Sequence, residues 1–280
     1  MYINFFSLSL LVLLIYSSYI LGQRSSPLQV EKDTAVYELL TKYHHYTELD
    51  QLLQQWASNY SKLANVFEVG KSYTGRSLFA MHLTSPMVTD NEKEQDEKLL
   101  LKPKFKWIAN MHGDEAIGRE MLTALIYYLL LNSQSDTRIN RLLSSTDIYI
   151  MPTMNPDGFE NSIEGVCDSR SINGRGNTKN VDLNRDFPSQ YQPLKQWKNG
   201  TIVDLFFDRQ PETIAVMKWI LKENFVLSAN LHGGSLVASY PYDETIYHTD
   251  NTYGDSPDDS LFRYLARTFA KNHLTMSKRI

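Results

Sequence analysis

A histidine and a glutamate three residues apart stand where two local patterns meet. The segment Phe105 to Asn110 is apolar and extended, His112 follows it, and Glu115 opens an apolar run with helical periodicity, Ala116 to Leu131. At the junction of a strand and a helix, these two side chains can converge on one point. An imidazole and a carboxylate are two of the three protein ligands that a catalytic zinc ion takes, with the fourth position left for water.

The third ligand must come from elsewhere in the chain. His232 is the best candidate, because it also ends a strand-like run, Phe225 to Leu231. A histidine at a strand end also fits a surface position. The zinc hypothesis therefore depends on the residues that accompany the three ligands.

A polar segment from Asn155 to Asn180 is longer than most connecting loops, and loops of that length are usually functional or disordered. It contains Gly174-Arg175-Gly176-Asn177, and the run Val181 to Phe187 follows shortly after it. The guanidinium of arginine is a planar fork that pairs bidentately with a carboxylate. Zinc, a carboxylate clamp and a cation for an oxyanion together indicate hydrolysis of a peptide bond at a free C-terminus.

The elements around these residues alternate between strands and helices. Helices are expected within Thr34–Leu63 with one break, and at Glu115–Asn132, Pro211–Asn224 and Asp258–His273. Strands are expected at Val66–Val69, Leu78–Leu83, Phe105–Asn110, Thr146–Met151, Phe225–Leu231 and Leu236–Tyr240. This order predicts an α/β fold, a mixed, mostly parallel twisted sheet with helices on both faces. Ligands in such sheets bind beyond the strand ends, where His112 and His232 fall.

Composition narrows the class of protein. The chain has 280 residues and a net charge of -4, with no long basic run, so nucleic acid is not an expected partner. Cys167 is the only cysteine, which excludes a disulfide within the chain. A lone cysteine in a secreted protein suggests a missing or intermolecular partner.

The N-terminus indicates a secretory route. Residues Phe5 to Leu21 form an uncharged apolar run that predicts a signal peptide cleaved near Gly22. A membrane anchor is the alternative, although the run is shorter than the roughly 20 residues that a spanning helix needs. Asn59 and Asn199 open Asn-x-Ser/Thr sequons and are candidate glycosylation sites. The predicted organisation is a signal peptide (1–22), a short lead (23–33) and one catalytic domain (34–280).

From about Val36 to its last residue, the sequence resembles the zinc metallocarboxypeptidases. Within them, it is most similar to the secreted regulatory branch of carboxypeptidases D, E, M and N. Several motifs carry the resemblance, in order and at family-like separations: Gly75-Arg76-Ser77, Asn110-Met111-His112-Gly113-Asp114-Glu115, Met154-Asn155-Pro156-Asp157-Gly158-Phe159, Asp182-Leu183-Asn184-Arg185-Asp186-Phe187-Pro188 and Ala229-Asn230-Leu231-His232-Gly233-Gly234.

The resemblance implies one zinc ion per chain, held by His112, Glu115 and His232. Arg175 matches the arginine that polarises the scissile carbonyl and holds the developing oxyanion. Asp182 matches the carboxylate that accepts a hydrogen bond from a ligand histidine and sets its tautomer.

The resemblance also implies how a substrate is held. Asn184 and Arg185 match the pair that binds the terminal carboxylate of a peptide or protein. Asp243 lies where the regulatory branch places the acid that selects a C-terminal Lys or Arg, although it could equally be a turn residue. Asp114 replaces the family's usual Asn at a spacer position, so little effect is expected.

The sequence departs from the family at its C-terminal end. Related domains continue past Thr275-Met276-Ser277 through a segment with a tyrosine that closes over substrate and a glutamate that acts as general base, followed by a transthyretin-like β-sandwich. This sequence ends at Ile280, and Glu244, the only glutamate after His232, does not match that base. Because a positioned base contributes ~100- to 10,000-fold, the sequence predicts an incomplete catalytic domain of severely reduced activity.

Two functions therefore remain open. The first is a secreted zinc carboxypeptidase that uses zinc-activated water to remove basic C-terminal residues. The second is a catalytically inactive, carboxypeptidase-like peptide-binding protein or a gene fragment. Membrane attachment is expected only if a longer form carries an anchor. A zinc amidase or deacylase on a related fold would not need Asn184 and Arg185, so their presence counts against it.

Overall fold

The computed structural model describes residues 2–4, 27–86, 102–166, 173–189, 197–198, 201–202, 206–244 and 252–279. Cys167, Asn199 and the predicted cleavage point near Gly22 lie outside these residues, so the predictions made for them stay open. Within the described part, no helix is both long and apolar enough to cross a membrane.

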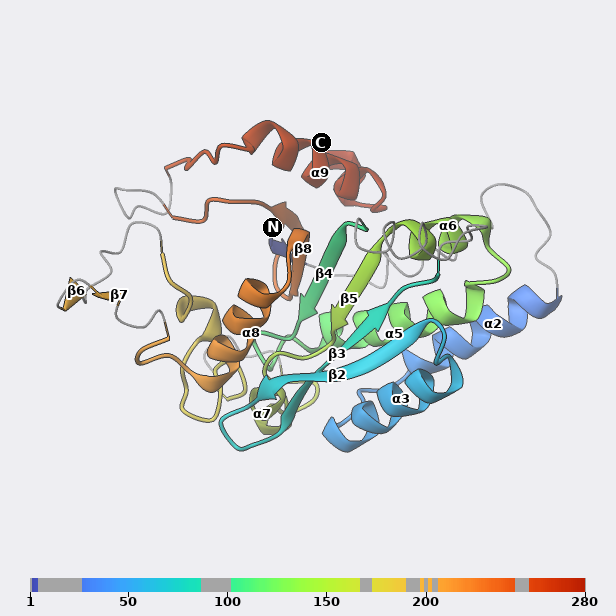
Figure 1. Cartoon of the computed structure of the whole chain (residues 1–280), viewed down its shortest axis with the longest axis horizontal. Coiled ribbons are helices and arrows are strands. Elements are labelled where there is room, and N and C mark those ends of the chain that lie inside the picture. The colour runs from blue at the N-terminus through green and yellow to red at the C-terminus, as the bar shows by residue number, and fades with distance from the viewer. Residues whose placement is uncertain are drawn as a thin grey trace.

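A mixed sheet forms the centre of the fold, as predicted, with its strands in the order β2-β3-β5-β4-β8-β1-β9 (Figure 1). The neighbours β5, β4, β8 and β1 pair in parallel, whereas β2, β3 and β9 join antiparallel at the two sides. The strands are β1 (Tyr2–Asn4), β2 (Ala64–Lys71), β3 (Ser77–Leu83), β4 (Lys104–Ala109), β5 (Asp147–Met151), β8 (Phe225–His232) and β9 (Val237–Ser239). A separate hairpin pairs β6 (Trp197–Lys198) with β7 (Thr201–Ile202).

The strand β1 was not expected. Tyr2–Asn4 pairs in parallel with β8 and antiparallel with β9, so these three residues lie between two strands of the sheet. They belong to the segment predicted to be a signal peptide. Its removal would take β1 out of the sheet.

Helices cover both faces of the sheet (Figure 1). They are α2 (Pro27–Leu39), α3 (Tyr46–Asn59), α5 (Ala116–Asn132), α6 (Thr137–Ser145), α7 (Pro156–Asn161), α8 (Pro211–Lys222) and α9 (Asp259–Lys271), with 3-10 turns at Leu183–Arg185 and Met276–Arg279. On one face, α2, α3, α5 and α6 share a hydrophobic core with the strands; α8 builds a second core on the other face.

The apolar run after Glu115 becomes the central helix of the larger core. Most residues of α5 are buried, which explains why its sequence is apolar around nearly its whole circumference. By contrast, α3 buries one stripe, Leu49, Leu53 and Trp56, and its other residues are half-buried or exposed. A buried α5 fixes the position of the loop before it, and that loop carries His112 and Glu115.

Candidate metal centre

The two histidines reach the same edge of the sheet because their strands are parallel neighbours. In the register of β4 with β8, Ala109 pairs with Leu231, so His112, just after β4, and His232, the last residue of β8, lie at strand ends that are side by side. Asn110 turns the chain after β4 with a positive φ of 55°. Its Nδ2 donates to the carbonyls of His112 and Gly113 at 2.9 and 2.8 Å, which holds the ligand loop in a tight turn.

Three side chains converge as predicted. His112 Nδ1 lies 2.9 Å from Glu115 Oε1, His232 Nδ1 lies 2.9 Å from Glu115 Oε2, and the two Nδ1 atoms are 3.2 Å apart. In the described part of the chain, His112, Glu115 and His232 are the one group of side chains found that could hold a metal ion. Both histidines are buried.

This donor set fits zinc. Ligand atoms of a tetrahedral zinc site, with bonds near 2.0–2.2 Å, lie roughly 3.3–3.6 Å apart, close to the separations seen here. Two imidazole nitrogens that face each other repel unless a cation or a proton lies between them. Two nitrogens and a carboxylate directed at one point are therefore suited to hold a cation.

Asp182 sets the tautomer of His112. Its Oδ1 lies 2.9 Å from His112 Nε2, so that ring nitrogen carries the proton and Nδ1 keeps its lone pair for a metal. The other oxygen of Asp182 accepts a hydrogen bond from Arg175 Nη2 at 2.9 Å. Arg175 Nη1 also lies 3.5 Å from Glu115 Oε1. The Asp182 carboxylate thus connects Arg175, which is predicted to hold the oxyanion, to His112, which is a predicted metal ligand.

The carboxylates of the centre are held ionised. Without a metal ion, burial raises the pKa of Glu115, but the hydrogen bonds and charge of the His112 and His232 rings, when these are protonated, outweigh burial and bring the pKa down to about 2. For Asp182, burial acts in the same direction and is outweighed by the charge and hydrogen bond of His112 and by Arg175, so its pKa is lowered.

The loop that carries Arg175 packs directly on the ligand loop. Backbone N–H groups of Gly113 and Asp114 donate to the carbonyls of Arg175 and Gly174 at 3.3 and 3.1 Å. A Cβ at Gly113 would lie 2.5 Å from the carbonyl oxygen of Gly174 in the Arg175 loop, and 2.2 Å from the carbonyl carbon of Gly158 in α7. Glycine is therefore required at position 113 for the approach of the two backbones.

The predicted carboxylate clamp lies on a short helix beside the centre. Leu183–Arg185 forms a 3-10 turn capped by Asp182, whose Oδ1 accepts from Asn184 N at 2.9 Å. Leu183 is buried, so the turn is fixed in the smaller core, while Arg185 stays exposed. The residue that orients His112 therefore also starts the turn that presents Asn184 and Arg185.

Two further acidic residues, Asp243 and Glu244, follow β9 in the chain. Asp243 is exposed in the bend after β9. Glu244 accepts a hydrogen bond from Ser189 Oγ. The role of Asp243 in specificity stays a prediction.

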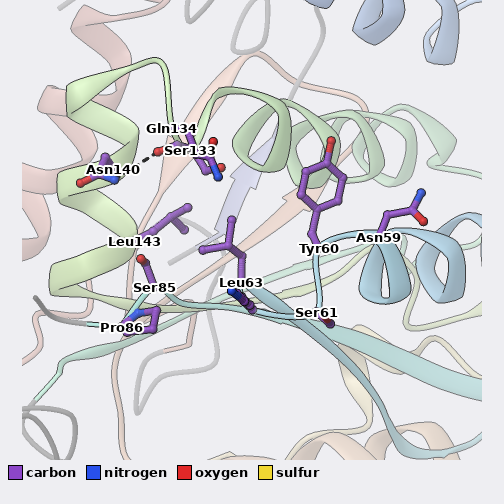
Figure 2. A pocket seen from close by; sticks show the side chains of 11 residues that line it. Asn59, Tyr60, Ser61, Leu63, Ser85, Pro86, Ser133, Gln134, Asn140 and Leu143 are labelled. Atoms are coloured by element: carbon purple, nitrogen blue, oxygen red, sulfur yellow. Dashed lines mark hydrogen bonds between the residues drawn. The ribbon is translucent and has the colours of Figure 1, made fainter. Parts of the chain in front are cut away.

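A cavity of about 480 Å³ lies elsewhere, between the end of α3 and the connection of α5 to α6 (Figure 2). None of the predicted site residues of the metal centre lines it. The exposed Asn59 of the first sequon lies at this cavity.

Comparisons with known proteins find relatives over most of this chain. The family described as zinc carboxypeptidase matches residues 49–279. Carboxypeptidase M of Mus musculus is 42% identical over 239 residues, which cover 85% of this chain and 49% of that relative. Carboxypeptidase D of Mus musculus is 42% identical over 234 residues, which cover 84% of this chain and 15% of that relative.

Solved structures share the fold. The crystal structure of thrombin activatable fibrinolysis inhibitor superposes with a TM-score of 0.62 at 17% identity, covering 96% of this chain and 62% of that one. Carboxypeptidase A from Helicoverpa armigera gives a TM-score of 0.58 at 18% identity, covering 92% and 58%. The chain spans about half the length of carboxypeptidase M, and far less of carboxypeptidase D.

Proposed function

The chain belongs to the zinc carboxypeptidase family, and from that premise we propose that it is a secreted enzyme that removes basic C-terminal residues, Lys or Arg, from peptides and proteins. The observation that carries the proposal is the convergence of His112, Glu115 and His232 at one sheet edge, beside Arg175 and the clamp turn. When bound, zinc activates water and polarises a carbonyl.

The protein side chains have separate tasks in this proposal. Glu115 and the Nδ1 atoms of both histidines hold the metal, and Asp182 keeps the His112 ring in the binding tautomer. Arg175 stabilises the negative charge that develops on the scissile carbonyl oxygen.

Recognition of the substrate follows from charge and position. Asn184 and the exposed Arg185 bind the terminal carboxylate through hydrogen bonds. Asp243, exposed in the bend after β9, pairs with the cationic side chain of the C-terminal residue. A free carboxylate and a basic side chain together define the substrate class.

A second candidate function is a non-catalytic protein that binds peptide C-termini. It needs only the clamp turn at Leu183–Arg185 beside the metal-binding group. Both candidates require the same clamp, and they differ only in whether the bound peptide is cleaved.

The Arg185→Ala variant tests the clamp shared by both candidates. Loss of a charge-assisted hydrogen bond worth about 1.5–3 kcal/mol should weaken binding of an Arg-terminated peptide by about 10- to 100-fold. Calorimetric titration of the zinc-loaded chain measures this loss. Binding of the same peptide as a C-terminal amide should be weak in both wild type and variant. Equal affinity for acid and amide in the wild type would contradict carboxylate recognition.

Secretion and glycosylation are part of the proposal. The apolar run Phe5 to Leu21 and the exposed Asn59 support them. Expression in a secretory host should yield protein in the medium whose N-terminus lies near Gln23 and whose mass falls on treatment with an N-glycosidase. The Asn59→Gln variant should lose part or all of that mass shift. Retention of the apolar run in the secreted protein, or no mass shift, would contradict the corresponding step.

A further inference from the structure

A buried carboxylate and a buried amide meet behind the loop that carries Arg175. Glu212, in the first turn of α8, is fully buried, and Asn177 is 3% exposed. Asn177 Nδ2 donates to Glu212 Oε2 at 3.2 Å and to Gln210 Oε1 at 2.8 Å. The other oxygen of Glu212 accepts from the backbone N–H of Tyr73 at 2.8 Å. Neither residue is in the set predicted to bind metal or substrate.

Asn177 also shapes the turn on which it lies. Its Oδ1 accepts from the backbone N–H groups of Lys179 and Val181 at 2.9 and 3.3 Å. Its own backbone N–H donates to the carbonyl of Val181 at 3.1 Å. One side chain therefore closes the turn 177–181 with its oxygen and fastens the turn to α8 with its nitrogen.

This turn lies between two residues of the metal centre. Arg175 is two residues before Asn177, and Asp182 directly follows Val181. A second bond fastens the far end of the same stretch, because Gln210 N donates to Asp186 Oδ2 at 2.8 Å. The start of α8 thus holds the chain on both sides of Asp182, the residue that orients His112.

We propose that Asn177 and Glu212 are positioning residues of the metal centre, which hold Asp182 and Arg175 in place through the turn 177–181. This inference rests on the proposed zinc site. In this proposal Asn177 and Glu212, which lie outside the site, keep the Asp182 carboxylate within hydrogen-bond distance of His112 Nε2.

Zinc affinity of the full chain, measured by competition with a chromophoric chelator, tests the proposal without relying on turnover. Loss of a residue that orients a metal ligand costs about 10- to 100-fold in metal affinity. Asp182→Asn should fall in this range, and Asn177→Ala should weaken zinc binding by about 10-fold. The matched control is Asn132→Ala, which removes another buried asparagine, one that donates to the Tyr128 carbonyl at 3.0 Å in α5. Its zinc affinity should equal that of wild type.

A double-mutant cycle shows whether Asn177 acts through Asp182. If it does, Asn177→Ala should change zinc affinity by less than about 3-fold once Asp182→Asn is present, instead of adding its full effect. If the two substitutions reduce zinc affinity additively, Asn177 does not act through Asp182. If Asn177→Ala alone binds zinc as tightly as the wild type, the proposal is overturned. A wild-type chain that binds no zinc would instead contradict the proposed function.

A reciprocal exchange covers the case in which Asn177→Ala does not fold. Asn177→Asp places two carboxylates together, and Glu212→Gln places two amide donors together, so each single variant should lose zinc affinity. In the double variant, the new amide at position 212 donates to the new carboxylate at position 177 and still accepts from Tyr73 N. The carboxylate at position 177 still accepts from the backbone N–H groups of Lys179 and Val181. Recovery to within about 3-fold of wild type is the expected result. A double variant no better than the weaker single one would contradict the pairing.

Discussion

The His232→Ala variant is expected to bind zinc about 1,000-fold more weakly than the wild type. His232 is one of three proposed protein ligands, and structural zinc sites bind with about 10–16 kcal/mol, so the loss of one ligand removes roughly 4 kcal/mol. His232 is the last residue of β8 and is not part of the hydrophobic core, so removal of its ring should leave the core packing intact. Chelator competition measures the affinity, and circular dichroism checks the fold.

A control histidine separates the metal centre from general effects. His82 in β3 stacks on Tyr149 with ring centroids 4.3 Å apart and is not among the predicted ligands. His82→Phe keeps this stacking and should leave zinc affinity unchanged. Equal losses in the two variants, or an unchanged affinity in His232→Ala, would contradict the assigned ligand set.

The Asp157→Asn variant is expected to lower the free energy of unfolding by about 1.5–3 kcal/mol, the worth of a hydrogen bond to a charged group. The Asp157 side chain is fully buried and bonds to Arg76 Nη1 at 2.6 Å. It also accepts from Ser72 Oγ and Thr74 N at 3.0 and 2.9 Å. An asparagine would direct an amide group at these donors. Urea denaturation of the zinc-free variants measures the change.

The same residue predicts an acid dependence. Burial raises the pKa of Asp157, but hydrogen bonds from Thr74 and Arg76 outweigh it, so the folded-state pKa is lowered. Its stabilisation is therefore present above the unfolded-state pKa of about 4 and is lost as the pH falls through the folded-state value. The difference between wild type and Asp157→Asn should shrink below about pH 4.

Asp136→Asn is the matched control for this acid dependence. Asp136 caps α6. Burial raises the pKa of Asp136, but its hydrogen bonds with Arg138 outweigh burial and lower the pKa below the usual value. Asparagine also caps helices well, so this variant should change stability by less than about 1 kcal/mol. A difference for Asp157→Asn that stays constant from neutral to acid pH would contradict the assigned ionisation.

The metal centre could be predicted because each ligand stands where a clear pattern ends. The strand before His112 and the strand before His232 were both expected, and their parallel pairing brings the two rings together. The polar segment Asn155 to Asn180 was predicted to be functional or disordered, and its residues Gly174 and Arg175 pack on the ligand loop. The hydrophobic periodicity of the sequence predicted the strands, and the ends of those strands predicted where the candidate ligands lie.

Other features could not be predicted because their partners are distant in the chain. Asn177 and Glu212 are 35 residues apart, and Asp157 and Thr74 are 83 apart, so no local pattern indicates that they meet. The helix α6 was missed although its signal was present: Asp136 caps it, and Ile139 and Leu143 lie four residues apart on its buried side. The helix α7 was included in a polar loop because it spans only six residues.

Zinc-dependent release of arginine from an N-blocked dipeptide tests the central claim most directly. The assay compares the zinc-loaded chain with a His112→Ala variant, and a substrate ending in Arg with a matched substrate ending in Phe. We expect arginine release by the wild type, faster than release of phenylalanine and lost in the variant. A folded chain that binds one zinc ion and releases no arginine would contradict the enzyme and leave the peptide-binding function.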